Sequence, residues 1–161
     1  MSTSQDFSQD EKLLKKILKR IINSTPGIKH VLIIDDTGIT ILSQSKYRFS
    51  DENVSVEKIG AIGGAVFTAG EEQGQILGYG SINLQITEYN EGIIFSVQVD
   101  QGVLCVATDL NVQIGLIRAL LKRWAPKIAR ILKRYLESTS EQEGINKELK
   151  ELFNSDSLGM L

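Results

Sequence analysis

The chain opens with a helical pattern of apolar positions. Leucine and isoleucine recur every three or four residues from Leu13 to Ile22, opposite a basic face, which predicts an amphipathic helix. Ser8 and Glu11 have the spacing of a capping box at its start. The turn sequence Thr25-Pro26-Gly27 then predicts its end.

Two runs rich in β-branched residues follow, at 28–35 and 39–45, and Asp36-Thr37-Gly38 supplies a turn between them. This arrangement predicts a β-hairpin. The segment Val31-Leu32-Ile33-Ile34 is apolar at successive positions and so has no polar face. We therefore expect helices on both faces of the sheet that contains it.

A second helix is predicted from about Val54 to Leu77, with Ser50 or Asp51 as its N-cap. Small residues crowd into it: Gly60, Ala61, Gly63, Gly64, Ala65, Ala69 and Gly70. Each glycine inside a helix costs about 0.5–1 kcal/mol relative to alanine. Close packing must offset that cost.

The pattern then becomes extended again. The run 81–89 alternates, with Ile82, Leu84 and Ile86 on one predicted face, and runs 93–100 and 103–108 follow after short turns. Three strands joined by such turns are typical of an antiparallel meander.

A last helix is predicted after Asp109 or Asn111, either of which is a candidate N-cap. Its apolar stripe comprises Ile114, Ile117, Leu121, Trp124, Ile128, Ile131 and Tyr135. Because Pro126 lacks an N–H group, we expect a kink or break near Trp124 and a new helix from the proline. From Glu137 the chain is acidic and is expected to be a flexible tail, although its apolar positions at 145, 149, 152 and 153 are compatible with a helix formed on docking.

The composition limits what such a domain does. The 161 residues suit one domain, with an expected division into a flexible N-terminus at 1–8, the domain at 9–124, a basic helical extension at 125–136 and the tail at 137–161. One cysteine, Cys105, excludes an internal disulfide, and one histidine, His30, excludes sites that need paired Cys or His ligands. The polar N-terminus and the absence of an apolar run of about 18 residues predict a cytoplasmic protein.

The net charge of −2 hides an uneven distribution. Residues 1–23 carry five basic and three acidic groups, and residues 24–110 carry four and eleven. Residues 111–136 carry seven basic groups and no acidic one, whereas residues 137–161 carry two and six. The sequence thus places a basic helix between an acidic body and an acidic tail.

The predicted order of elements is α-β-β-α-β-β-β-α, and four stretches in this order resemble one family. They are 27–38 around the first hairpin, Ile59-Gly60-Ala61-Ile62-Gly63-Gly64-Ala65, Leu104-Cys105-Val106-Ala107, and 111–118 at the start of the last helix. On them the chain resembles the roadblock/LC7 domain, whose group includes dynein roadblock light chains, the small Ragulator subunits and the bacterial polarity regulator MglB. The resemblance implies an α+β (α/β) sandwich with a longin/profilin-like fold and a five-stranded, mainly antiparallel sheet with helices on both faces.

The resemblance also implies partners. Roadblock domains pair their central helices and join their third strands, and some bind small Ras-like GTPases. We expect a homodimer, with a heterodimer as the alternative, that scaffolds or activates a GTPase. The implied dimer interface comprises Ile59, Gly60, Ile62, Gly63, Gly64, Val66, Phe67, Ile82, Leu84 and Ile86. The implied GTPase-binding residues are Phe67, Gly70, Glu71, Glu72 and Gln73.

The glycines of the central helix have two explanations. In one, they let the helix pack closely on its own sheet. In the other, Gly60, Gly63 and Gly64 let two helices approach across a dimer axis, and pairing through residues 81–89 protects an apolar sheet edge from aggregation. Both explanations stay open from the sequence.

The basic helix likewise has two explanations, a solvated face or a surface for an anionic partner. Such a partner is an acidic protein, the acidic tail of the chain itself or an anionic membrane. The residues concerned are Lys122, Arg123, Lys127, Arg130, Lys133 and Arg134. The alternative function is therefore a membrane-surface adaptor, or a trafficking or motor-complex adaptor using the dimer surface. A nucleic-acid partner is not expected, because no recognition motif is present and few aromatics accompany the basic residues.

Catalytic chemistry is not expected. The chain has no Gly-Lys dipeptide and so no phosphate-binding loop with its lysine. Asp35-Asp36 suits a turn better than a cation site, His30 has no motif partner, and Cys105 lies in an apolar strand. We predict a non-enzymatic module without cofactor or metal.

Overall fold

The computed structural model describes residues 3–46 and 55–159, with side chains at 9–46 and 55–154. Its helices are α1 (Thr3–Ser24), α2 (Val56–Leu77) and α3 (Ile114–Gly159). Its strands are β1 (Ile28–Ile34), β2 (Thr40–Ser45), β3 (Gln85–Glu88), β4 (Ile93–Val99) and β5 (Gly102–Thr108). The element order predicted from the sequence is confirmed.

The described strands form one antiparallel sheet in the order β2-β1-β5-β4-β3. The first hairpin pairs His30 with Ser45, and β1 pairs on its other side with β5, where Ile34 faces Val103. β3, β4 and β5 form the predicted meander. The sheet edge at β3 therefore lies at the far side from β2.

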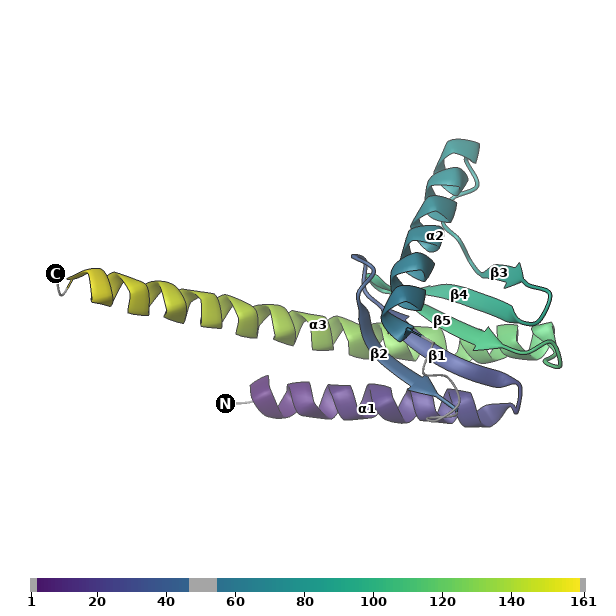
Figure 1. Ribbon diagram of the computed structural model, residues 1–161, viewed down its shortest axis with the longest axis horizontal. Helices are drawn as coiled ribbons and strands as arrows, with labels where there is room; N and C mark the ends of the chain where they lie inside the picture. Colours follow the sequence, from purple (N-terminus) through teal and green to yellow (C-terminus); the bar gives the residue numbers. More distant parts are fainter. Residues whose placement is uncertain (1–2, 47–54, 160–161) are drawn as a thin grey trace.

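Helices cover the sheet on both faces, as the continuous apolar run in β1 predicts. α1 and α3 lie side by side on one face and α2 lies on the other (Figure 1). Val31 and Ile33 join the large core beneath α1 and α3. Leu32 and Ile34 point the other way, into a smaller core with Phe67 of α2.

The helix starts differ from three sequence predictions. α1 begins at Thr3, so Ser8 lies inside the helix and the capping box with Glu11 is wrong. The side chain of Ser55 caps α2 by accepting a bond from the Lys58 N–H, while Ser50 and Asp51 lie outside the described residues.

The start of α3 is also later than predicted. The Asp109 side chain accepts the Asn111 N–H in a turn, at 2.8 Å, and neither residue caps the helix. The first helical bonds of α3 run instead to the carbonyl of Gln113. The turn satisfies the backbone locally and delays the helix by one turn.

α3 is one helix of 46 residues that contains Pro126, so the predicted break near Trp124 is wrong. A proline removes a single backbone bond, whereas Trp124 and Ile128 on either side are both buried in the core and stabilise the helix across the proline. The helix continues through the acidic segment from Glu137.

The third strand is shorter than the alternating pattern predicts, because β3 spans only four residues. Leu84 packs on the core beneath α1 and α3, but Ile82 packs on the α2 side. The Ile82 N–H donates to a carboxylate oxygen of Glu71 at 3.0 Å instead of joining the sheet. The predicted common face of Ile82, Leu84 and Ile86 is therefore wrong at Ile82.

Candidate interaction surfaces

The glycines of α2 face the domain's own sheet. A Cβ atom on Gly60 would meet Thr40 Oγ1, and one on Gly64 would lie 3.2 Å from Gly38 Cα. A Cβ on Gly63 would contact Cys105 and Ile34, at 3.4 and 3.5 Å. The structure therefore supports the first explanation of these residues, close packing on the sheet. Their assignment to a helix–helix dimer contact stays a prediction, and Phe67, which was assigned to the same contact, is 4% exposed.

The opposite side of α2 is apolar and exposed. Positions 62, 66, 69, 73 and 76 follow one another at spacings of three and four, so they share one helix face. Ile62 is 64% exposed and Val66 is 48% exposed, and the same face ends in Ile76 and Leu77. We call Ile62, Val66, Ile76 and Leu77 the α2 surface. Of the predicted interface, Ile62 and Val66 lie on it, and Ile59 is half-buried beside it.

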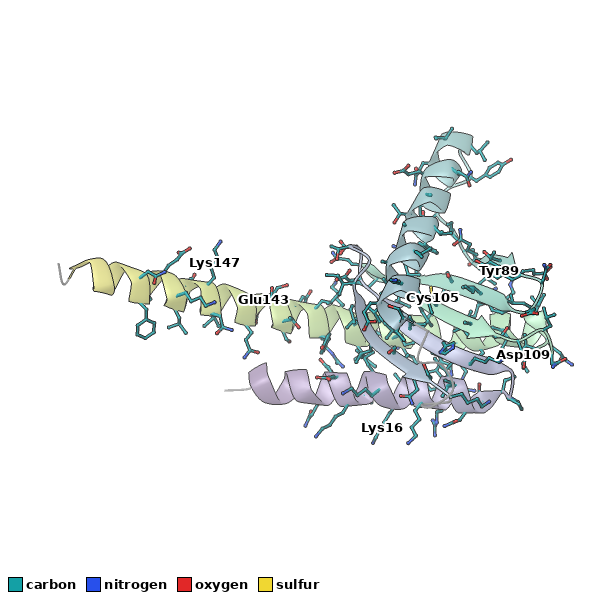
Figure 2. The ribbon with its side chains drawn as sticks, in the orientation of Figure 1. Lys16, Tyr89, Cys105, Asp109, Glu143 and Lys147 are labelled. Carbon is teal, nitrogen blue, oxygen red and sulfur yellow. The ribbon has the colours of Figure 1, made fainter. Side chains whose placement is uncertain are left out.

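A groove of about 170 Å³ adjoins the α2 surface. It exists because α2 packs mainly on β1, β2 and β5 and leaves the β4 and β3 side of this sheet face uncovered. Figure 2 shows Cys105 beneath α2 and Tyr89 beyond the end of β3. The residues that line this groove are mostly apolar: Leu32, Ile59, Ile62, Gly63, Val66, Gln85, Thr87, Tyr89, Ile94, Ser96, Cys105 and Ala107.

The predicted GTPase-binding residues do not share one surface. Phe67 is buried, and Gly70 faces inward, where a Cβ would lie 2.8 Å from both Gln85 and Ile82. Glu71 is half-buried and its carboxylate accepts a hydrogen bond from the Ile82 N–H, so it positions the segment before β3. Glu72 and Gln73 are exposed. Only these last two are placed to contact a partner.

The six predicted anion-binding residues of α3 are also divided. Lys127, Arg130 and Arg134 line a groove between α1 and α3. Lys122 lies on another side of the helix, beside Gln98 and Asn83, and Lys133 lies near Asp100. Arg123 lies 5.7 Å from the Trp124 ring centre.

The groove between α1 and α3 has a volume of about 670 Å³. Its lining, which we call the basic groove, comprises Leu13, Lys16, Ile17, Arg20, Trp124, Lys127, Arg130, Ile131 and Arg134. Lys16 and Arg20 of α1 were not singled out from the sequence. Their spacing of one helical turn was the available signal, but only the antiparallel packing of α1 on α3 places them opposite Lys127 and Arg130.

The ammonium group of Lys127 lies 4.9 Å from the centre of the Trp124 ring. At this distance a cation is attracted by the negative face of the ring. The tryptophan thus holds one positive charge at the floor of the basic groove.

The side chains of Asp35, His30 and Cys105 form hydrogen bonds within the fold. Asp35 Oδ1 accepts bonds from the N–H groups of Thr37 and Ile39, both at 2.9 Å, which is turn chemistry as predicted. His30 Nδ1 lies 2.8 Å from Ser45 Oγ in the first hairpin. Burial raises the pKa of the Cys105 thiol, which lies 3.1 Å from Ser96 Oγ, so the thiol is a poor nucleophile at neutral pH.

Among the described residues, no group of three or more metal-ligating side chains comes together. No helix within the same ranges is long and apolar enough to cross a membrane.

The chain matches one family model across most of its length. Residues 12–136 match the family described as "Mitogen-activated protein kinase kinase 1 interacting". Two relatives come from Methanocaldococcus jannaschii. The uncharacterized protein MJ0310 is 35% identical over 107 residues, which are 66% of this chain and 90% of the relative. The uncharacterized protein MJ0714 is 32% identical over 118 residues, which are 73% and 95% of the two chains.

Solved structures share the fold at low sequence identity. A structure described as MglB with a tetrameric arrangement has a TM-score of 0.69 and 14% identity, covering 81% of this chain and 92% of its own. Myxococcus xanthus MglB has a TM-score of 0.62 and 20% identity, covering 76% and 94%. A roadblock/LC7 domain from Streptomyces avermitilis has a TM-score of 0.62 and 12% identity, covering 75% and 95%.

Proposed function

The chain belongs to the mitogen-activated protein kinase kinase 1 interacting family and is a roadblock/LC7 domain protein, and from this premise we propose that it is a non-enzymatic, dimeric module that binds and regulates a small Ras-like GTPase. The fold likeness to MglB supports a role as an interaction module of the roadblock type. The identity of the partner as a GTPase is proposed from the resemblance to the roadblock family.

The observation that carries the proposal is the α2 surface. Side chains of the size of Ile62 and Ile76 are rarely left exposed together on one helix face unless a partner covers them. The adjoining groove extends the apolar area onto the sheet. A second copy that covers both removes this area from water, and apolar burial of this kind contributes roughly 25 cal/mol per Å².

The edge strand β3 supports a second copy as the occupant. It is exposed along one side, and Ile86 on it is exposed as well. An exposed edge with apolar side chains is prone to non-specific pairing. Isologous pairing of β3 with its copy satisfies the backbone and lengthens the sheet across the dimer axis. The revised dimer residues are the α2 surface together with Tyr79, Ile86 and Tyr89.

A GTPase would contact the exposed polar margin of the paired helices, at Glu72. α2 contains one basic residue, Lys58, and no arginine. The helix therefore has no side chain to insert as an arginine finger. Regulation would come from the shape that the paired helices impose on the switch loops of the GTPase.

Single-turnover GTP hydrolysis tests this function directly. Small Ras-like GTPases of the source organism, loaded with GTP, are mixed with the dimer, and each is also captured on immobilised protein. We expect one of them to bind and to show a changed hydrolysis rate. Glu72→Lys should abolish both effects, whereas the matched change Glu57→Lys, elsewhere on α2, should abolish neither.

Absence of binding across the whole set of GTPases would contradict the proposal. Binding without a change in rate would identify a scaffold. Capture of a peptide from a motor or trafficking complex by the same surface, without any GTPase, would favour the adaptor function instead.

A further inference from the structure

The C-terminal third of α3 extends away from the body of the domain (Figure 1). Every side chain from Ser140 to Asn154 is exposed. A helical segment of this length is marginal in water when nothing packs on it. A surface that packs on the exposed apolar side chains of the segment would therefore stabilise it.

This segment has an apolar side of its own, which we call the terminal stripe: Ile145, Leu149, Leu152 and Phe153. These four side chains are between 46% and 72% exposed. Glu141 and Glu148 flank the stripe at helical spacing, and the whole segment 137–154 carries five acidic and two basic residues. Figure 2 shows Glu143 and Lys147 on the same stretch, clear of the body of the domain.

The basic groove has the complementary character. Five of its nine lining residues are cationic and none is acidic, and its floor is formed by Leu13, Ile17, Trp124 and Ile131. Leu13 is substantially exposed there. The groove wall on α3 runs from Trp124 to Arg134, about 15 Å at the helical rise, and the terminal stripe from Ile145 to Phe153 is about 12 Å long. The stripe therefore fits within the groove in length as well as in charge.

The terminal stripe cannot reach the groove of its own chain. α3 is continuous from Ile114 to Gly159, so the stripe is held away from residues 124–134 of the same helix. We propose that the terminal stripe of one chain docks in the basic groove of a second copy. The apolar residues would pack on the groove floor, and Glu141 and Glu148 would pair with the cations of both walls.

The periodicity of α3 makes this docking reciprocal. Lys127, Ile131 and Arg134 of the groove precede Ile145, Leu149 and Leu152 of the stripe by 18 residues each. Eighteen residues are five full helical turns, so the groove wall and the stripe lie on the same face of α3. Two antiparallel α3 helices would therefore place each stripe on the other chain's groove at once, with two-fold symmetry.

This contact does not depend on the proposed GTPase function. It uses the sheet face covered by α1 and α3, whereas the α2 surface lies on the opposite face. The test is therefore made with Ile62→Glu/Val66→Glu present in every chain, so that pairing through the α2 surface does not contribute. Failure of the α2 pairing would leave the outcome of this test unchanged.

A charge swap provides the test. One full-length variant carries Lys16→Glu/Arg130→Glu in the groove, and another carries Glu141→Lys/Glu148→Lys beside the stripe. In each variant alone, the substituted residues face groups of like charge in a second copy of the same variant, whereas in a mixture of the two variants they face groups of opposite charge. We expect each variant alone to sediment as a monomer and the equimolar mixture as a dimer, with an affinity at least about tenfold above either variant alone.

Trp124, the single tryptophan of the chain, gives a second readout. Because it forms part of the groove floor, its fluorescence should shift when the two charge-swap variants are mixed. The control variant Lys122→Glu/Lys133→Glu reverses two charges of α3 outside the groove. It should keep the self-association of the parent protein, and circular dichroism should show all variants folded.

Two results would overturn the proposal. One is unchanged self-association of both single charge-swap variants. The other is a mixture that stays monomeric while the parent protein binds phosphatidylserine vesicles and Lys16→Glu/Arg130→Glu loses that binding, which would make the groove a lipid site.

Discussion

Arg134 Nη2 donates a hydrogen bond to Asp10 Oδ1 across 3.1 Å and thereby joins the start of α1 to the middle of α3. The two residues are 124 positions apart in the sequence. Asp10 is 8% exposed, whereas the side chain of Arg134 is 63% exposed. The pair therefore adds a polar contact to the apolar packing between the two helices.

Removal of the Asp10 charge should loosen this contact. Asp10→Asn is expected to lower the free energy of unfolding by about 1 kcal/mol, since the exposed guanidinium is screened by water. Urea unfolding of Asp10→Asn, Arg134→Met and the double variant gives the coupling energy, expected at about 0.5 kcal/mol. Glu11→Gln, which removes the exposed pair with Lys15, is the control with a smaller loss. A coupling energy of zero would show that the pair contributes nothing to stability.

A leucine at position 64 should damage the fold rather than the dimer. Because a Cβ there already lies 3.2 Å from the backbone of Gly38, Gly64→Leu is expected to lower the free energy of unfolding by at least about 2 kcal/mol. Gly144 of α3 has no atom within 4 Å of its Cβ position. Gly144→Ala should therefore raise stability by about 0.5–1 kcal/mol through helix propensity. Thermal unfolding of both variants measures these changes in stability. A fully stable Gly64→Leu monomer would favour the helix–helix explanation of the glycine.

The α2 surface should control the dimer. Ile62→Glu/Val66→Glu introduces two charges on an exposed face, so we expect dissociation with a change in monomer stability within about 1 kcal/mol. Analytical ultracentrifugation measures the dissociation and circular dichroism checks the fold. Thr68→Glu, on another exposed side of α2, should leave the mass unchanged. An unaltered mass for the double variant would place the dimer interface elsewhere.

Pro126 should be destabilising where it stands. It lies inside α3 and has no N–H to donate to the carbonyl of Lys122, so Pro126→Ala is expected to raise the free energy of unfolding by about 1–3 kcal/mol. The nearby exposed change Lys133→Ala should stay within about 0.5 kcal/mol. Urea titration measures both. A loss of stability in Pro126→Ala would mean that the proline stabilises the chain by restricting its unfolded state.

Stability should fall at alkaline pH because of Cys105. Burial raises the pKa of its thiol above the ordinary value of 9.0, so the unfolded chain releases this proton first. The stabilisation is fully present below the ordinary pKa and is lost as the pH rises towards the raised one. Unfolding between pH 8.5 and 10 should therefore slope downward, and more steeply than in Cys105→Ala. Identical slopes would contradict this, since Tyr135, whose pKa burial also raises, is present in both chains and cancels in the comparison.

The sequence was sufficient for the elements whose pattern is local. The first hairpin, the meander and the two-sided burial of β1 follow from runs of β-branched residues and their turns. Pro126 was misjudged because tertiary burial of Trp124 and Ile128 outweighs one lost hydrogen bond. Ile82 was misjudged because the Glu71 carboxylate takes its N–H from the sheet.

The site was less predictable for a geometrical reason. Composition shows that α2 is rich in small residues but not which way they face, and Gly60 and Gly64 turn towards the sheet while Ile62 turns away. The basic groove is formed by two helices from opposite ends of the chain. The charges of Lys16 and Lys127 therefore come together in one groove only after folding.

Because α3 is one unbroken helix, the number of residues between two of its side chains sets both the distance and the angle between them. A single inserted residue between Leu136 and Ser140 would rotate everything beyond it by about 100° and turn Ile145 away from the face that carries Lys127. An insertion of seven residues would nearly restore the orientation while lengthening the arm by about 10 Å. Length variation in this segment among related chains is thus restricted to near-whole helical turns if both ends of α3 are to work together.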